Sequence, residues 1–213
     1  MEGRVLLGMN CSLAPAPEAL ATWIKAQNYA ESKGINVELQ LYQMTANSYL
    51  IDHSLINDVV NKKRFSHLMW ASDDTIPSED IIVRLVNDDK DIISGVYRTR
   101  DPNTPTLAVW GGDTESFNKY LEDGAVIERE FSSGHSLLMK QEVVSAVYDA
   151  HPELDFVTAE GVTIRSLFMP FIRDKKIYLN DWAFCQRAKD LGFKCWVDFG
   201  VKLNHKCFVW LGF

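Results

Sequence analysis

Residues 65–77 decide the fold, and they read Phe65-Ser66-His67-Leu68-Met69-Trp70-Ala71-Ser72-Asp73-Asp74-Thr75-Ile76-Pro77. The mainly apolar first half is typical of a buried β-strand, and it stops at two adjacent carboxylates. A Thr-Ile-Pro-Ser turn follows and opens a predicted helix that Ser78 caps. We therefore expect the acids where the strand leaves the sheet, which is where α/β sheets bind ligands. The alternative is that Asp73 and Asp74 are solvated loop residues or helix-capping acids.

The chain before and after this stretch alternates between predicted strands and helices. Its apolar runs and alternating patterns predict strands at 4–10, 35–42 and 91–97, and its helical periodicity predicts helices at 18–33, 50–60 and 79–86. Gly34 is placed to end the first of these helices. The resulting βαβαβ order predicts right-handed crossovers and a mostly parallel sheet.

The alternation breaks in the second half of the chain. A polar, proline-marked loop at 98–105 precedes strands expected near 106–110, 125–131 and 135–139, with no helix between them. A helix is predicted at 141–150, and the segment 152–176 fits no single pattern. The last unit reads as a strand at 176–179, a helix from Asn180 that Gly192 ends, and closing strands at 193–205. We expect an α/β fold in one domain over residues 1–213, with a small antiparallel portion, and the apolar end suggests that it was cut from a longer chain.

Composition excludes several classes of function. The chain has 22 Lys plus Arg against 29 Asp plus Glu, and its formal net charge is −7. Nucleic acid is therefore not an expected partner, because no basic run can follow a phosphate backbone. An acidic protein that binds an anionic substrate needs local positive charge, which a divalent cation held by carboxylates usually supplies. No apolar run has membrane-spanning length and the N-terminus lacks a signal-peptide pattern, so we expect a cytoplasmic protein.

The four cysteines are scattered at Cys11, Cys185, Cys195 and Cys207. None forms a C-x-x-C pair, and this predicts free thiols in a reducing compartment. A zinc site built from Cys195, Cys207 and His205 is a less favoured alternative, because structural zinc sites usually show tighter pairs.

The order of several motifs resembles one known family, although the G-x-G-x-x-G, P-loop, H-E-x-x-H and G-x-S-x-G motifs are all absent. The chain from Arg4 to His205 resembles GT-A-fold nucleotide-sugar glycosyltransferases, and it is similar to the small family-2-like enzymes of large viruses and phages, those of chlorella viruses included. The resemblance is carried by Trp70–Asp80, Asp91–Tyr97, Ser133–Met139, Asn180–Cys185 with Gly192-Phe193, and His205.

This resemblance implies a GT-A-like domain and a set of metal and nucleotide contacts. The family's Asp-x-Asp corresponds to Ser72-Asp73-Asp74, with serine in place of the first acid. Asp74 is the implied metal ligand, His205 returns to the same cation, and Asp73 with Ser72 lies near the ribose or a metal-bound water. Without the resemblance, a lone histidine such as His205 is more often an ordinary surface or core residue. Oxygen ligands with an imidazole favour Mn²⁺, with Mg²⁺ as the alternative.

Further site residues follow from the same resemblance. Asp181 corresponds to the acid near the acceptor, which is the general base in inverting members, although helix capping explains Asn-Asp equally well. Asn10, Cys11 and Arg64 are candidates for base, ribose or phosphate contacts, and Arg64 is equally well explained as a solvated helix-end cation. The candidates for sugar or acceptor contacts are Tyr97, Arg98, Trp110 and His135, and core packing is the default for each of the aromatic side chains.

The function expected from this resemblance is metal-dependent transfer of a hexosyl or deoxyhexosyl group from a nucleotide sugar, a UDP-sugar in first place, to a hydroxyl of a glycan acceptor. For a viral protein this would take place in the host cytoplasm. Three alternatives stay open: a carbohydrate- or nucleotide-sugar-binding module on a degenerate scaffold, a nucleotidyltransferase, and a glycoside hydrolase with two facing carboxyls. The nucleotidyltransferase is disfavoured because residues 13–17, Leu-Ala-Pro-Ala-Pro, replace a glycine-rich basic loop.

Overall fold

The computed structural model describes residues 4–11, 16–43, 55–61, 64–97, 114–157, 161 and 163–206. The first half of the chain contains β1 (Arg4–Cys11), α1 (Pro17–Ser32), β2 (Asn36–Gln43), a helical segment at 55–61, β3 (His67–Ser72), β4 (Thr75–Ile76), α3 (Ile81–Asn87) and β5 (Ile92–Tyr97). The second half contains α4 (Thr114–Asp123), β6 (Val126–Arg129), β7 (Ser136–Lys140), α5 (Gln141–Ala150), the 3₁₀ turn η1 (Pro152–Leu154), β8 (Asp155–Val157), β9 (Thr163–Arg165), β10 (Phe171–Arg173), β11 (Lys176–Tyr178), α6 (Asn180–Asp190) and β12 (Cys195–His205).

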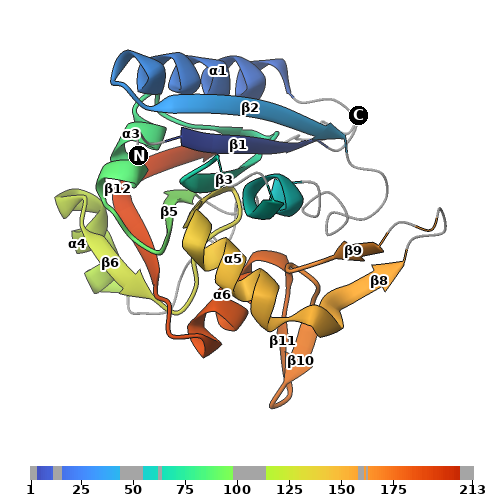
Figure 1. Cartoon of the computed structure of the whole chain (residues 1–213). Coiled ribbons are helices and arrows are strands. Elements are labelled where there is room, and N and C mark those ends of the chain that lie inside the picture. The colour runs from blue at the N-terminus through green and yellow to red at the C-terminus, as the bar shows by residue number, and fades with distance from the viewer. Residues whose placement is uncertain are drawn as a thin grey trace, which may run out of the picture.

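A mixed sheet lies at the centre of the structure (Figure 1). Its strand order is β2-β1-β3-β7-β5-β12-β4, and β6 pairs with β12. Strands β2, β1, β3, β5 and β12 point the same way, whereas β7, β4 and β6 run against their neighbours. Two small antiparallel hairpins, β8-β9 and β10-β11, lie outside this sheet. The mostly parallel sheet with a small antiparallel portion is therefore confirmed.

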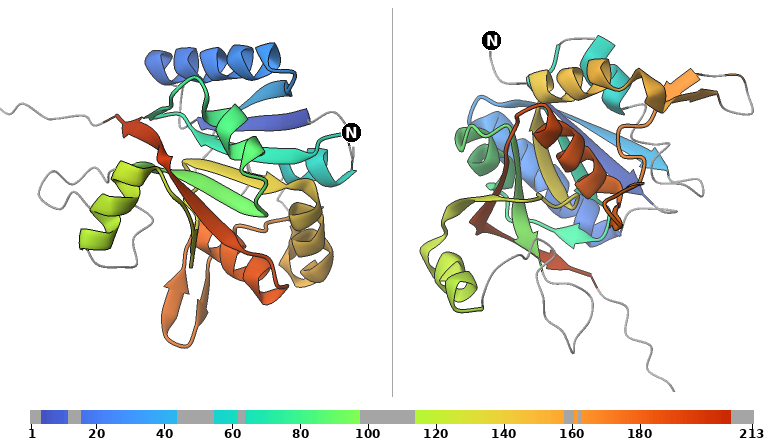
Figure 2. Two further views of the ribbon diagram at one scale, coloured as in Figure 1. Left: turned by 90° about the vertical axis from the view of Figure 1, so that its left-hand side faces the viewer. Right: turned by 90° about the horizontal axis from the view of Figure 1, so that it is seen from below.

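Helices cover both faces of the sheet, as Figures 1 and 2 show. The alternation along β1 explains the two layers, because successive side chains of a strand point to opposite faces. Leu6 packs in the cluster with the 55–61 helix, α5 and α6, whereas Val5, Leu7 and Met9 pack with α1 and α3. A strand buried on both faces reads as a continuous apolar run, which is why β1 and β3 were recognisable from sequence.

Some local predictions were wrong. Helix α4 lies where only strands were expected. Its sequence TESFNKYLED is mostly polar, but Tyr120 and Leu121 within it pack against the small cluster around Phe199. Ser78 does not cap α3: the N-cap residue is Asp80, whose carboxylate accepts a hydrogen bond from the Ser78 hydroxyl at 2.6 Å. The strand expected at 106–110 lies outside the described residues.

The cysteine predictions can be checked at three positions. Cys11, Cys185 and Cys195 are buried and free, as expected, and Cys207 lies outside the described residues. The alternative zinc site is wrong, because Cys195 and His205 stand at opposite ends of the 11-residue strand β12. Among the helices in the described ranges, none combines the length and apolar character needed to cross a bilayer.

Strand β12 contains a bulge that redirects its second half. Val197 pairs with Ser94 and Lys202 pairs with Val96, so four residues of β12 lie opposite the single residue Gly95 of β5. The buried Asp198 holds this bulge, since its carboxylate accepts hydrogen bonds from the Gly200 N–H at 2.7 Å and from the Arg84 guanidinium at 3.0–3.2 Å. Beyond the bulge, the strand continues to His205, which pairs with Thr75 of β4.

We predict that Gly95→Ala destabilises the fold by about 1–3 kcal/mol. A Cβ at this position would lie 2.5 Å from Val201 Cγ1 and 2.7 Å from the Val201 carbonyl oxygen, which is backbone and cannot move aside cheaply. Urea denaturation measures the change, with the exposed Lys202→Ala on the same bulged strand as control, expected within about 0.5 kcal/mol of wild type. Equal stability of Gly95→Ala and wild type would show that the bulge is not closely packed.

Candidate active site

Three polar side chains converge at the carboxyl ends of β3 and β12. Asp74 lies in the turn between β3 and β4, His205 is the last residue of β12, and His135 directly precedes β7. Because β7 runs antiparallel to β3, with Ser136 opposite Ala71, it begins at the edge where β3 ends. Residues separated by more than sixty positions in sequence are thereby brought to one corner of the sheet.

The three side chains form a compact cluster of potential metal ligands. One atom of each, from Asp74, His135 and His205, lies within 4.8 Å of the other two. His205 Nε2 is 3.3 Å from Asp74 Oδ2, and His135 Nδ1 is 3.7 Å from Asp74 Oδ1. All three are partly buried. Two imidazole nitrogens and one carboxylate oxygen are a donor set that suits divalent transition ions better than Mg²⁺, so these residues fit such an ion.

Ser72 orients the carboxylate of this cluster. Its hydroxyl donates a hydrogen bond of 2.5 Å to Asp74 Oδ1. The serine that replaces the first acid of the expected motif thus supports the second acid, in the way that groups around metal ligands usually do. From sequence, His135 was expected to contact sugar, and its place beside Asp74 was not predicted. The antiparallel pairing of β7 with β3 brings it there, and that pairing is not encoded locally.

Tyr97 forms a wall against both imidazoles. Its ring centroid is 4.1 Å from that of His135 and 5.3 Å from that of His205, and only 8% of the residue is exposed. Burial raises the pKa of Tyr97 well above its ordinary value, so the hydroxyl stays protonated. Tyr97 therefore packs against both imidazoles of the cluster, and its contact with a sugar or acceptor stays a prediction.

Asp181 lies beside the cluster, in the first turn of α6. Its Oδ2 accepts a hydrogen bond from the Gly134 N–H at 2.7 Å, and its Oδ1 accepts one from the Trp182 N–H at 3.0 Å. The N-cap of α6 is Leu179, and helix capping does not account for the bond to Gly134. Burial raises the pKa of Asp181, and these hydrogen bonds lower it by less. Since Gly134 precedes His135, the same loop contacts both Asp181 and Asp74.

Asn10 and Cys11 lie at the carboxyl end of β1, where Asn10 is opposite Ser72 of β3. The Asn10 Oδ1 is buried and has no hydrogen-bond partner within the described ranges, which is unusual for a buried polar atom. Burial and the negative charge of Asp73 raise the pKa of Cys11 to about 11, so its thiol is protonated and unreactive. Asp73 itself lies in the turn with Asp74, and its carbonyl accepts the Ala16 N–H at 3.2 Å.

The structure does not bring Arg64 to this corner. Arg64 precedes the amino end of β3, whereas the cluster lies at the carboxyl end, and its guanidinium pairs with Glu38 at 2.7 Å and lies over the Phe65 ring. The solvated-cation alternative describes it better than nucleotide binding. Arg98 and Trp110 lie outside the described residues.

No protein-family model and no curated protein sequence matches the chain. Solved structures do match it. A197 from STIV superposes with a TM-score of 0.59 at 12% identity, over 96% of this chain and 86% of A197. GalNAc-T7 with UDP, GalNAc and Mn²⁺ superposes with a TM-score of 0.55 at 7% identity, over 97% of this chain. The chain has a GT-A-like fold.

The similarity to these solved structures concerns the fold. This chain spans only 43% of the GalNAc-T7 chain, and at such low identities the GT-A-like fold is all that is shared. A glycosyltransferase involved in the glycosylation of the major capsid of PBCV-1 superposes with a TM-score of only 0.37, at 11% identity over 70% of this chain and 67% of its own.

We predict that Asp181→Asn changes the pH dependence of stability. Because burial raises the folded-state pKa above the ordinary 3.8, Asp181 contributes stability at low pH that is lost as the pH rises through the raised pKa. The amide side chain of the variant cannot ionise. The free energy of unfolding of wild type should therefore fall relative to that of Asp181→Asn as the pH increases across this window. Urea denaturation at a series of pH values measures the difference, and a difference independent of pH would contradict the assignment.

Proposed function

We propose that this chain is a metal-dependent glycosyltransferase that moves a sugar from a nucleotide sugar, a UDP-sugar in first place, to a hydroxyl of a glycan acceptor. The cluster of Asp74, His135 and His205 carries the proposal, because it lies at the carboxyl edge of a GT-A-like sheet. The fold shared with GalNAc-T7, which was solved with UDP, GalNAc and Mn²⁺, supports the choice of donor and cofactor.

We assign Mn²⁺ to the cluster, with Asp74, His135 and His205 as its protein ligands. A bound divalent cation would supply Lewis-acid stabilisation of the negative charge that develops on the diphosphate leaving group. Ser72 holds the Asp74 carboxylate by a hydrogen bond, and Tyr97 supports both imidazoles from behind. The assignment makes His135 a metal ligand instead of the sugar contact that the sequence suggested.

The nucleotide is assigned to the carboxyl end of β1. The buried Asn10 Oδ1 is an acceptor that a donor group of the base or ribose would satisfy, and Asp73 and Ser72 lie in the adjacent turn and strand end. Cys11 is buried and its thiol is protonated, so it contributes an apolar side chain at this end of the strand. The unsatisfied Asn10 acceptor supports the assignment of the nucleotide to this end of β1.

Asp181 is our candidate for the general base. A base works best when its pKa approaches the operating pH, and burial moves the pKa of this carboxyl in that direction. The two backbone N–H groups of Gly134 and Trp182 fix both carboxylate oxygens, so the orientation of the group does not depend on other side chains. Asp181 would then accept the proton of the acceptor hydroxyl.

We predict that the wild-type protein binds Mn²⁺ and that Asp74→Ala, His135→Ala and His205→Ala each weaken binding at least tenfold, because each removes one of three ligands. Electron paramagnetic resonance of free Mn²⁺ measures binding without any turnover. His151→Ala is the matched control, since His151 lies at the C-terminal end of α5 and pairs with Glu153. The same three variants should lose Mn²⁺-dependent release of UDP from UDP-sugars, and His151→Ala should retain it. Wild type without Mn²⁺ binding and without metal-dependent release would sink the proposal.

Ser72→Asp tests the metal preference separately. A second carboxylate beside Asp74 adds an oxygen ligand, and Mg²⁺ prefers oxygen. We expect the ratio of Mg²⁺ to Mn²⁺ affinity to rise at least tenfold in the variant, measured by competition of Mg²⁺ against bound Mn²⁺. An unchanged ratio would place Ser72 outside the coordination of the cation.

A further inference from the structure

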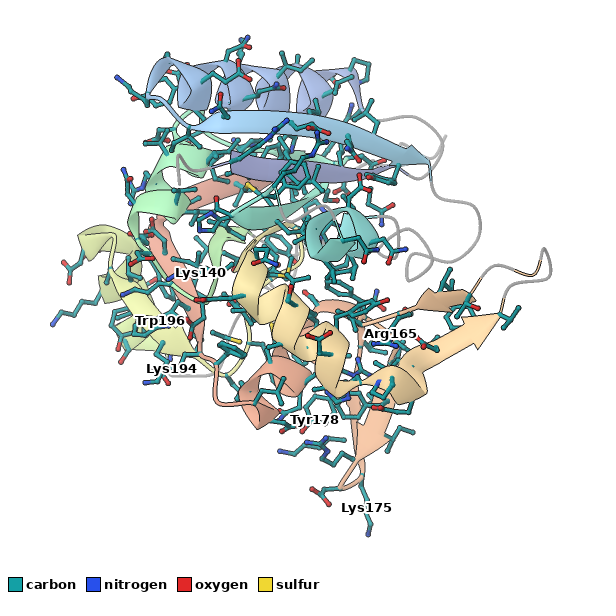
Figure 3. The ribbon with its side chains drawn as sticks, viewed as in Figure 1. Lys140, Arg165, Lys175, Tyr178, Lys194 and Trp196 are labelled. Carbon is teal, nitrogen blue, oxygen red and sulfur yellow. The ribbon has the colours of Figure 1, made fainter. Side chains whose placement is uncertain are left out.

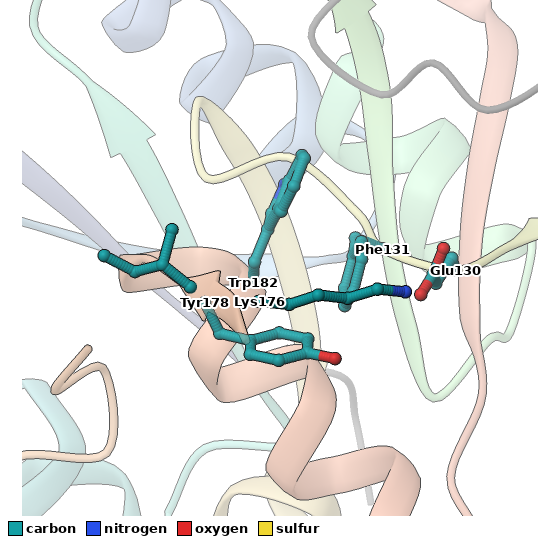
Figure 4. A pocket seen from close by; sticks show the side chains of 6 residues that line it. Glu130, Phe131, Lys176, Tyr178 and Trp182 are labelled. Atoms are coloured by element: carbon teal, nitrogen blue, oxygen red, sulfur yellow. The ribbon is translucent and has the colours of Figure 1, made fainter. Parts of the chain in front are cut away.

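A pocket is lined in part by Trp182, the residue that follows Asp181 in sequence, and the residues expected from sequence do not account for it (Figure 4). It has a volume of about 350 Å³ and is lined by Glu130, Phe131, Lys176, Ile177, Tyr178 and Trp182. This volume falls in the lower part of the roughly 300–1,000 Å³ range of small-molecule sites. The lining residues come from the segment after β6, from β11 and from the start of α6, and Figure 3 shows Tyr178 at the base of the hairpin whose tip carries Lys175.

The pocket is tied to the candidate active site by two short covalent connections. Trp182 follows Asp181 directly, and Phe131 lies four residues before His135. Four residues of extended chain span at most about 14 Å, so Phe131 cannot be farther than that from His135. Within this segment the Gly134 N–H bonds to Asp181, and a Cβ on Gly134 would come within 3.2 Å of the Asp181 side chain. The loop before β7 and the first turn of α6 thus connect the pocket to Asp181.

Aromatic rings form one wall of the pocket. Phe131 and Trp182 stack in parallel, with 4.8 Å between ring centroids and 9° between planes, and Tyr178 meets Phe131 edge-on at 5.9 Å. Trp182 is nevertheless 38% exposed, and Ile177 is 58% exposed. Lys189 Nζ lies over the Phe131 ring at 5.1 Å from its centroid, so Phe131 is already contacted by Trp182 and Lys189. The exposed Trp182 ring is the part of the wall that a flat apolar ligand face can contact.

Opposite charges stand at the rim of this wall. The carboxylate of Glu130 and the ammonium of Lys176 point toward one another in Figure 4. A carboxylate accepts hydrogen bonds and an ammonium donates them, so together they serve hydroxyl groups, which do both. An aromatic wall with such a rim matches a pyranose ring, whose C–H face is apolar and whose edge carries hydroxyls.

We propose that this pocket binds a pyranose ring of the acceptor, stacked on the exposed Trp182 ring with its hydroxyls toward Glu130 and Lys176. The inference rests on the proposed function, since it makes the ring the bearer of the hydroxyl that Asp181 deprotonates. It gives the glycan acceptor of the proposed function a binding site at the start of α6. It adds Tyr178 and Trp182 to the acceptor contacts expected from sequence, of which Arg98 and Trp110 lie outside the described residues.

Binding is tested directly, without turnover, by saturation-transfer NMR with methyl pyranosides of glucose, galactose, mannose and N-acetylglucosamine. We expect ring-proton signals for at least one sugar in wild type, at least a tenfold weaker affinity in Trp182→Ala, and a smaller loss in Trp182→Phe, which keeps an aromatic face. Leu191→Ala is the control, because Leu191 is also exposed and ends the same helix. Cooperative urea unfolding of each variant shows that it is folded.

The outcomes separate this inference from the proposed function. Wild type that binds Mn²⁺ and UDP but gives no ring signal with any sugar, or the same signals in Trp182→Ala, overturns the acceptor site alone. Saturation of hexanol protons in place of sugar protons assigns the pocket to an apolar ligand and overturns the carbohydrate class. Where transfer is measurable, Trp182→Ala should raise the acceptor KM at least tenfold, whereas the control Leu191→Ala should leave it unchanged. Trp182-dependent sugar binding without Mn²⁺ or UDP binding supports the sugar site and overturns the transferase.

Discussion

The candidate site depends on the ion pair between Arg84 and the buried Asp198. This pair holds the bulge in β12, where four residues face one residue of β5, which is an excess of three. An odd excess reverses the side of the sheet to which every later residue points, because side chains alternate along a strand. His205 reaches the Asp74 turn only because β12 resumes pairing after this reversal. A structural ion pair on one side of the sheet thus determines which residues meet on its edge.

The parts of the structure that were predictable from sequence are those encoded locally. Apolar runs of strand length gave β1, β3 and β5, and the stop at Asp73-Asp74 placed the acids at a strand end. His135 could not be placed, because its position depends on β7 inserting antiparallel between β3 and β5, and such pairing is not local. The expectation for Arg64 failed for a similar reason: its charge is typical of an anion site, but it stands at the wrong end of β3 and pairs with Glu38.

The pocket lined by Trp182 was hidden from sequence by the shortness of its elements. The β10-β11 hairpin has strands of three residues, too short for a periodic pattern, and most of the segment 152–176 before it fitted no single element. Phe131 and Trp182 are fifty-one positions apart in the sequence, and no local pattern links them. Their stacking becomes visible only when α6 packs against the loop that precedes β7. Binding surfaces built from several short segments are in general the least predictable part of a fold.

Ser72 has an electrostatic consequence for how the site would load its substrate. Two neutral imidazoles and one carboxylate offset only one of the two positive charges of a divalent cation, whereas two carboxylates would offset both. A cation held by these three ligands would keep one net positive charge facing the diphosphate, and without the diphosphate it would be held more loosely. Binding of the two is then mutually dependent, and by thermodynamic linkage each strengthens the other by the same factor. A serine in place of an acid would thus make the binding of the metal and of the nucleotide positively cooperative.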